Sequence, residues 1–194
     1  VINTTNKSAA VSNKKFSTTF TNTVFVNYST SSFAPQLDFT AVTNSFTASY
    51  GAYLKTPSLY ADFNLDGKPD YVQTGDATTA VIPNTSTIAL ISFGTKIILN
   101  SGGNGAKVGD IDNDGLLDLI INSATNIYVY KNTSTIGGTI SFATPITIAF
   151  ALDKNKVLLK DMNGDGLLDL IGSNSSTISY LLNTTTGSTI NFNT

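Results

Sequence analysis

Carboxylates recur along this chain at a spacing that could hold a metal ion. Between residues 110 and 118, aspartates occupy positions 1, 3, 5 and 9, and glycine occupies position 6. Aspartates at alternate positions can turn their oxygens toward one cation, and glycine allows the sharp turn at positive φ that such a loop needs. Without a cation, carboxylates crowded this closely would repel one another. The spacing therefore predicts a loop that binds a hard cation, and aspartate, asparagine and carbonyl oxygens favour calcium.

The same pattern occurs three times. The loops begin 48 and 51 residues apart, and 22 residues after each first aspartate comes a similar tetrapeptide, Asn-Thr-Ser-Thr twice and Asn-Thr-Thr-Thr once. We expect about three Ca²⁺ ions, bound by side chains at positions 1, 3, 5 and 9 and by the backbone carbonyl at position 7. The loop with four aspartates is expected to bind most tightly. The predicted ligands are Asp62, Asn64, Asp66, Lys68, Asp70, Asp110, Asp112, Asp114, Leu116, Asp118, Asp161, Asn163, Asp165, Leu167 and Asp169.

Two other interpretations compete for these loops. An EF-hand needs a glutamate at position 12 and flanking helices, but position 12 is Gln73, Ile121 or Gly172, and strand-like residues follow each loop. Dockerin-type loops, which also need an acid near position 12, fail on the same ground. The loops could instead be solvated turns in which Asp and Asn side chains bond to nearby backbone. Three copies in one register favour the metal-binding interpretation.

At these residues the chain resembles the FG-GAP/VCBS repeats of integrin-α-like β-propellers, whose blades carry Asp-x-Asp/Asn-x-Asp-Gly-x-x-Asp calcium loops. The resemblance covers about residues 49 to 194, and a weaker partial copy precedes it. It implies blades of β-strands with a calcium loop in one hairpin of each blade. It also implies a place among surface and secreted proteins, without indicating a particular biological role.

The elements that must position these loops are short strands bounded by Gly, Asn, Asp, Ser or Pro, with no helical periodicity. We expect an all-β, β-propeller-like array of four-stranded blades, with about three complete repeats and an N-terminal partial blade. The chain is predicted to be a single repeat domain (1–194), divided into a partial blade at 1–47, repeats at 48–100 and 101–153, and a truncated repeat at 154–194. Third strands are expected at 79–82, 127–130 and 178–182, and fourth strands at 88–99, 139–150 and from 190 onward.

This number of repeats is lower than the 4 to 8 blades of most propellers. The chain could be a piece of a longer propeller, or it could close as a small four-bladed ring. Alternatively, open blade edges could pair with other copies of the chain, because unpaired strands template association.

Composition narrows the range of functions. The chain has no Cys, His, Glu or Arg, and ten of its 13 acidic residues lie in the three loops. Most general bases and activated nucleophiles are therefore missing, and we expect no enzyme activity. A net charge of −2 without a basic run argues against nucleic acid or an anionic membrane as partner. No apolar run is long enough to span a membrane. Because the chain starts at Val1, we interpret it as a mature or trimmed secreted product.

The sequence therefore predicts a non-catalytic, calcium-stabilised binding or adhesion module, extracellular or at the cell surface, with an unknown protein or glycan ligand. One alternative is a self-assembling subunit of a surface layer or fibre. Another is a carbohydrate-binding, lectin-like propeller with an aromatic platform, although inter-blade packing is the simpler role for its tyrosines. Turn formation is likewise simpler than glycosylation for the repeated Asn-Thr-Ser-Thr segments. The tyrosines in question are Tyr28, Tyr128, Tyr130 and Tyr180.

Overall fold

Strands and turns make up all the regular structure in the part of the chain that the computed structural model describes. This part comprises residues 19–27, 39–47, 54–75, 78–99, 101–150, 157–173 and 176–193. The chain divides into two units, residues 1–49 and residues 50–194. The prediction of an all-β fold is therefore confirmed for the described residues.

The described residues of the first unit form an antiparallel hairpin. Strand β1 (Thr19–Asn27) pairs with β2 (Phe39–Thr47), from Thr19 opposite Thr47 to Asn27 opposite Phe39. Of the segment 1–47 that was predicted as a partial blade, the structure describes this hairpin, and the rest lies outside the described residues.

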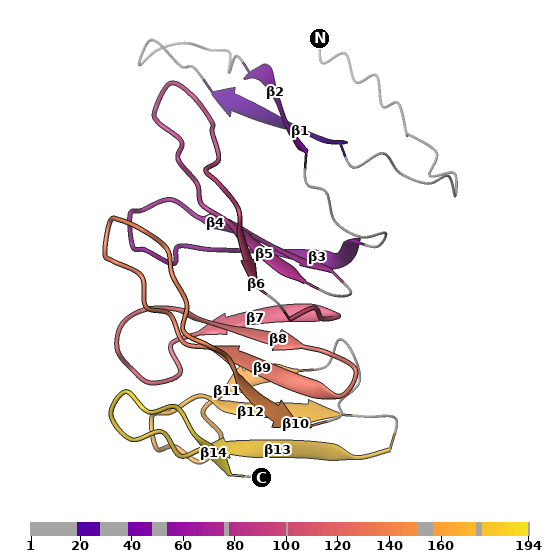
Figure 1. The fold of residues 1–194 in the computed structure, drawn as a ribbon, viewed down its shortest axis with the longest axis vertical. Coiled ribbons are helices and arrows are strands. Elements are labelled where there is room, and N and C mark those ends of the chain that lie inside the picture. Colours follow the sequence, from indigo (N-terminus) through magenta and orange to yellow (C-terminus); the bar gives the residue numbers. More distant parts are fainter. Residues whose placement is uncertain are drawn as a thin grey trace. The chain divides into compact units, whose positions relative to one another are not determined.

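The second unit contains three four-stranded antiparallel sheets, and the strands of each sheet follow chain order. Figure 1 shows these sheets stacked one after another. The first has β3 (Leu54–Ala61), β4 (Asp70–Gly75), β5 (Thr79–Ile82) and β6 (Ile97–Leu99); the second has β7 (Gly105–Gly109), β8 (Asp118–Asn122), β9 (Asn126–Tyr130) and β10 (Ile146–Ala149); the third has β11 (Leu158–Lys160), β12 (Asp169–Ser173), β13 (Ile178–Asn183) and β14 (Phe192–Asn193). The predicted four-stranded repeats are present, but the sheets form an open series and do not close into a propeller.

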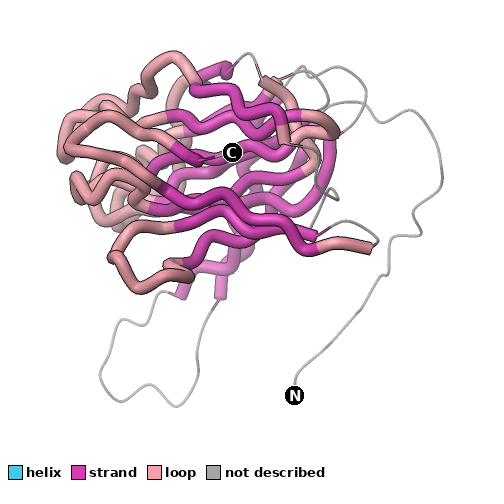
Figure 2. Tube along the Cα trace, turned by 90° about the horizontal axis from the view of Figure 1, so that it is seen from below, coloured by secondary structure: helices cyan, strands magenta, loops and turns pink. Residues whose placement is uncertain are grey.

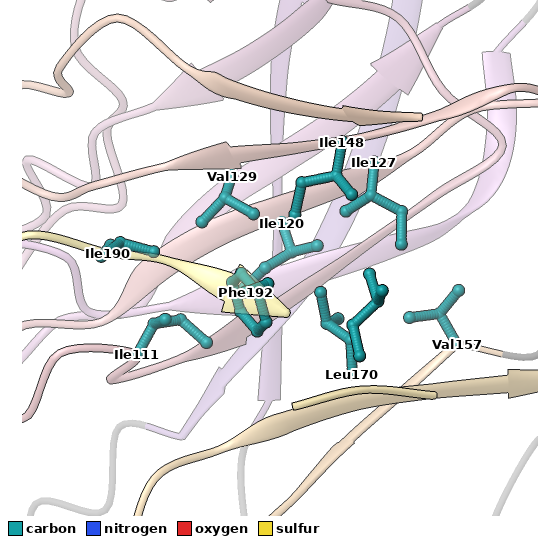
Figure 3. Close-up of a cluster of buried hydrophobic side chains, with 10 residues drawn as sticks. Ile111, Ile120, Ile127, Val129, Ile148, Val157, Leu170, Ile190 and Phe192 are labelled. Atoms are coloured by element: carbon teal, nitrogen blue, oxygen red, sulfur yellow. The ribbon is translucent and has the colours of Figure 1, made fainter. Parts of the chain in front are cut away.

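The hydrophobic core consists of two clusters that lie between neighbouring sheets, and the alternating side chains of the strands form it. Successive residues of a strand point to opposite faces, so the middle sheet sends side chains in both directions. From β8, Leu119 and Ile121 enter the cluster shared with the first sheet, whereas Ile120 enters the cluster shared with the third. Figure 3 shows the second of these clusters, in which Ile120 lies near Leu170 and Phe192. Burial on both faces explains why all of β8 is buried.

The fourth strands are shorter than predicted. Strand β6 covers only the last three residues of 88–99, and β10 only four residues within 139–150. The preceding residues form projecting segments that we call arms (84–93, 132–142 and 183–191). In the second arm, Ser134 Oγ accepts the N–H of Ser141 and donates to its carbonyl, so a side chain replaces part of the strand ladder. Hydrophobic and β-branched residues in the arms resemble a strand in sequence, but these serine contacts interrupt it.

The predicted repeat boundaries stay a prediction. The first unit ends at residue 49, close to the boundary expected after residue 47. The Asp-rich loops and the arms lie at one end of the stacked sheets, which is the left side of Figure 1 and the pink side of Figure 2.

Candidate metal centre

Each aspartate loop joins the first two strands of its sheet, between β3 and β4, β7 and β8, and β11 and β12. The position-6 glycines have φ of 83°, 89° and 86°, as the sequence predicted. Position 4 is left-handed as well, with φ of 55° at Leu65, 56° at Asn113 and 82° at Gly164. This second left-handed position was not predicted from the sequence. These two turns fold each loop back on its first aspartate.

The first aspartate of each loop accepts hydrogen bonds from the loop backbone. In the second loop, Asp110 Oδ1 lies 3.0 Å from the amide N of Asp114 and Oδ2 lies 2.8 Å from that of Gly115. Asp62 makes the same two contacts in the first loop, whereas Asp161 accepts from positions 4 and 6 in the third. Backbone N–H groups thus hold this carboxylate in place and offset part of its charge.

The position-9 aspartate is almost completely buried in all three loops, with exposures of 1%, 0% and 0%. In the second loop, Asp118 Oδ2 accepts the N–H of Ile111 at 2.9 Å, and Oδ1 accepts the N–H of Asn132 at 2.7 Å. Asp70 and Asp169 make equivalent contacts. Asn132 is the first residue of the repeated tetrapeptide, so this contact explains the constant 22-residue spacing. Burial raises the pKa of Asp118 to about 6 and also raises the pKa of Asp70.

Position 3 provides the strongest test of whether a cation fits. Asn64 is 5% exposed and Asp112 is 8% exposed. One oxygen of each, Asn64 Oδ1 and Asp112 Oδ1, is buried without any hydrogen-bond partner among the described residues. A buried oxygen without a partner is unfavourable, and a hard cation would satisfy it. Asn163 differs, because it is exposed and its Oδ1 accepts the N–H of Asp165.

Among the described residues, three carboxylates converge in the second loop. Carboxylate oxygens of Asp110, Asp112 and Asp118 all lie within 4.8 Å of one another. Oxygen-only ligands gathered around a small space suit calcium or another hard cation. At position 7, the N–H of Leu116 donates to Asp114 Oδ1 at 2.9 Å, and Lys68 and Leu167 make the same contact. Coordination by the three position-7 carbonyls stays a prediction.

One residue of the second loop's surroundings was not found by sequence reasoning. The ammonium of Lys131 donates to both Asp112 Oδ2 and Asp114 Oδ2. Burial opposes ionisation of Asp114, but hydrogen bonds from Lys131 and from the N–H of Leu116 outweigh it, so the pKa of that carboxyl is lowered. The only sequence signal was the position of Lys131 directly before the tetrapeptide asparagine.

The tetrapeptide asparagines also connect neighbouring sheets. Asn132 Nδ2 donates to the carbonyls of Phe63, in the preceding loop, and Leu117, at 2.8 and 2.9 Å. Asn183 repeats this arrangement with Ile111 and Leu168. Each asparagine Oδ1 accepts an N–H two residues later, as in a turn. Because Asn132 and Asn183 are 1% exposed, the structure supports the turn interpretation of these two segments over glycosylation.

Comparison with known families agrees with this geometry. The FG-GAP-like repeat matches residues 62–121 and 110–172, and each match begins at the first aspartate of a loop. Together the two matches cover more than half of the chain. The chain belongs to the FG-GAP-like repeat family. The resemblance expected from the loop residues is therefore confirmed.

FG-GAP repeats serve as binding or structural modules, often bind Ca²⁺, and occur mainly in extracellular or surface proteins. No curated protein matches this FG-GAP repeat chain. Within the described residues, no helix is long and apolar enough to cross a membrane.

Proposed function

We propose that this FG-GAP repeat protein is a non-catalytic, calcium-stabilised binding or adhesion module that works outside the cell or at its surface. The observation that carries the proposal is the pair of buried oxygens at position 3, Asn64 Oδ1 and Asp112 Oδ1, which find no hydrogen-bond partner in the part of the chain that the structure describes. They occupy the same position in two repeats and belong to loops whose other predicted side-chain ligands are carboxylates. Calcium coordination would satisfy both oxygens and neutralise the carboxylates around them.

The contacts of the first loop support a structural role for the ion. The backbone N–H of Gly137 donates to Asn64 O at 2.6 Å, and Asn64 Nδ2 donates to Gly138 O at 2.7 Å. The arm of the second sheet therefore holds a predicted ligand of the first loop. An ion bound by Asn64 would stabilise the contact between two sheets as well as one hairpin. Calcium would in this way set the rigidity of the surface that the module presents.

The proposed role can be tested by thermal unfolding of the protein in chelator and in excess calcium. Each filled site should add about 2.7 kcal/mol to the free energy of unfolding at 100 times its dissociation constant. We expect Asp66→Ala and Asp165→Ala each to remove about one site's share of this gain. Asp153→Ala removes an aspartate outside the loops and should leave the gain unchanged. Equal melting temperatures with and without calcium would contradict the proposal.

The extracellular assignment has its own test. Calcium sites of extracellular modules bind at roughly 10⁻⁴ to 10⁻³ M, and such sites would stay empty at cytosolic calcium levels. We expect the calcium midpoints of this protein to lie in that range. Submicromolar midpoints would contradict this part of the proposal.

A second candidate function, a self-assembling structural subunit, is favoured by the outer face of the third sheet. Ile127 and Val129 of the second sheet are 0% exposed because the third sheet covers them. Their counterparts in the third sheet, Ile178 and Tyr180, are 79% and 64% exposed. Among the described residues, no sheet covers this face. We propose that a second copy of the chain packs its own third sheet against it as a two-fold pair, which would be one of the contacts in such an assembly.

Sedimentation at micromolar concentration tests this assembly. The wild type should form dimers, and Tyr180→Asp should shift it to monomers by placing a charge in the contact. Ile136→Asp is the matched control, since Ile136 is 71% exposed but lies in the second arm. A monomeric wild type would count against assembly.

The lectin-like alternative has less support. Tyr130 is buried and its hydroxyl donates to Ser101 Oγ at 2.8 Å, which agrees with packing between sheets. Tyr128 is half-buried, and Tyr28 lies outside the described residues. Tyr180 is the exposed member of this set. No binding to a glycan array with the calcium sites filled would count against carbohydrate recognition, and the binding partner would then be sought among proteins.

A further inference from the structure

We propose that Lys131 is an internal counter-cation of the second aspartate loop, which holds the loop together at low calcium and weakens calcium binding there. This inference rests on the proposed function, because it assumes that the loops bind calcium. Lys131 Nζ lies 2.6 Å from Asp114 Oδ2 and also donates to Asp112 Oδ2. These carboxylates are positions 3 and 5 of the loop, so the ammonium engages side chains that a bound ion would need.

The backbone holds Lys131 beside the loop. The next residue, Asn132, is 1% exposed. Its N–H donates to Asp118, and its side chain donates to the carbonyls of Phe63 and Leu117. Because Asn132 is fixed by three hydrogen bonds, the start of the lysine side chain is fixed as well. The ammonium therefore reaches the loop with less loss of conformational entropy than a freely exposed lysine would suffer.

Among the described residues, no lysine bridges positions 3 and 5 of the other two loops as Lys131 does in the second. The residues that correspond to Lys131, directly before the tetrapeptide asparagine, are Pro83 and Leu182. Lys68 does contact Asp66 in the first loop, at 3.2 Å, but its side chain is 40% exposed and its partner is only two residues away. That pair is a surface contact of low energy. The combination of a lysine with a buried position-3 carboxylate is specific to the second loop.

The charges of the extra aspartate, Asp112, and of Lys131 offset each other. Position 3 is Asp112 in the second loop and asparagine in the other two, so the second loop has one more negative charge. The side chain of Asp112 is 0% exposed, and a buried carboxylate needs a counter-charge. Lys131 supplies that charge without a metal ion. Asp112 Oδ1 nevertheless has no hydrogen-bond partner within the described segments, so one buried oxygen is left for an ion.

Calcium must compete with this ammonium in the second loop alone. Positive charges a few ångströms apart repel each other strongly in a partly buried site, so the ammonium must move away when calcium binds. We therefore expect the first and third loops to fill at lower calcium than the second. This order reverses the ranking expected from the number of carboxylates, which did not take Lys131 into account.

The amide signals of the three position-6 glycines, Gly67, Gly115 and Gly166, can report each loop separately in a calcium titration followed by NMR. In the chelated wild type, the Gly115 signal should shift at higher calcium than the other two. In Lys131→Met, the Gly115 midpoint should fall on the order of tenfold, and the other midpoints should stay unchanged. Lys131→Arg keeps the charge and should keep the wild-type order. Lys68→Met, the matched control, should move the Gly67 midpoint less than about threefold.

The outcomes separate this inference from the proposed function. If none of the three signals responds to calcium in the wild type, the proposed function itself fails. If Gly67 and Gly166 respond but Gly115 responds at the same or lower calcium, the inference about Lys131 is overturned. An unchanged Gly115 midpoint in Lys131→Met also overturns it. Should that variant fail to fold in chelator, the order of the wild-type midpoints decides.

Discussion

At the residue scale, the backbone of each loop passes through two left-handed positions. Glycine occupies position 6 in all three loops, but position 4 is Leu65, Asn113 or Gly164. Asparagine and glycine adopt this conformation readily, whereas a residue such as leucine does so at a cost of roughly 1 to 2 kcal/mol. The side chain of Leu65 is also 44% exposed, so little burial compensates for that cost.

Replacing Leu65 with asparagine should therefore stabilise the protein. We expect Leu65→Asn to raise the free energy of unfolding by about 1 kcal/mol, as measured by urea unfolding in chelator. Leu116→Asn is the control, because Leu116 has no positive φ, and it should give no gain. A stability loss in Leu65→Asn would show that the leucine side chain has a packing role.

The buried carboxylate of Asp118 should make the calcium-free protein sensitive to pH. Burial raises its pKa from 3.8 to about 6, so the folded state holds this proton more tightly than the unfolded state. Its contribution to stability is greatest below pH 3.8 and falls by about 3 kcal/mol as the pH rises through 6. Carbon-13 NMR of the chelated protein should show the Asp118 carboxyl titrating near pH 6. Calcium should lower that pKa, and titration near pH 4 in chelator would contradict the account.

At the element scale, the tetrapeptide asparagine joins an arm to its own loop and to the preceding sheet. Asn132 and Asn183 each donate to a carbonyl in the loop before them. For Asn84, the structure shows one side-chain donation, to Pro69 O at 3.0 Å. Among the described residues, the same residue type therefore connects two sheets in the second and third repeats, whereas the contacts of Asn84 lie within the first repeat.

This difference predicts unequal effects of the same substitution. Asn132→Ala removes two hydrogen bonds donated to carbonyls and one accepted from Ser134. Because it leaves the buried carbonyl of Phe63 without that donor, it should destabilise the protein by about 2 to 4 kcal/mol. Asn84→Ala should cost about 1 kcal/mol. The comparison is made by urea unfolding, and equal losses would mean that the contact between sheets contributes little.

The sequence predicted the strands and loops well because their signals are local. The glycine at position 6 predicts a left-handed turn, and the apolar run after position 9 predicts a strand. Both signals come from neighbouring residues, and the structure has both features. The sequence shows the 22-residue spacing between each first aspartate and its tetrapeptide, but not the cause of that spacing. The cause is the hydrogen bond from the N–H of Asn132 to Asp118, which forms only when the arm folds. Lys131 was missed for the same reason. The predicted fourth strands were too long because the serine contacts across the arms have no clear sequence pattern.

At the scale of the whole molecule, the second unit is a series of sheets that each bury a face on a neighbour. The middle sheet is covered on both sides, and its position-2 residue Ile111 is 0% exposed, as is Phe63 in the first loop. The corresponding residue of the third loop, Met162, is 62% exposed. In such an array each sheet gains stability from its neighbours. Ions bound in the loops would add to that stability at the end of the sheets where the loops and the arms lie.

Whether the aspartate loops bind calcium can be measured by a calcium titration of the chelated protein in a calorimeter. We predict about three bound ions and a large rise in melting temperature between the start and the end of the titration. Binding heat should be absent in a variant that lacks the position-5 aspartates Asp66, Asp114 and Asp165. If the wild type shows no binding heat and an unchanged melting temperature, the aspartate loops are turns without a metal, and the calcium-dependent account is wrong.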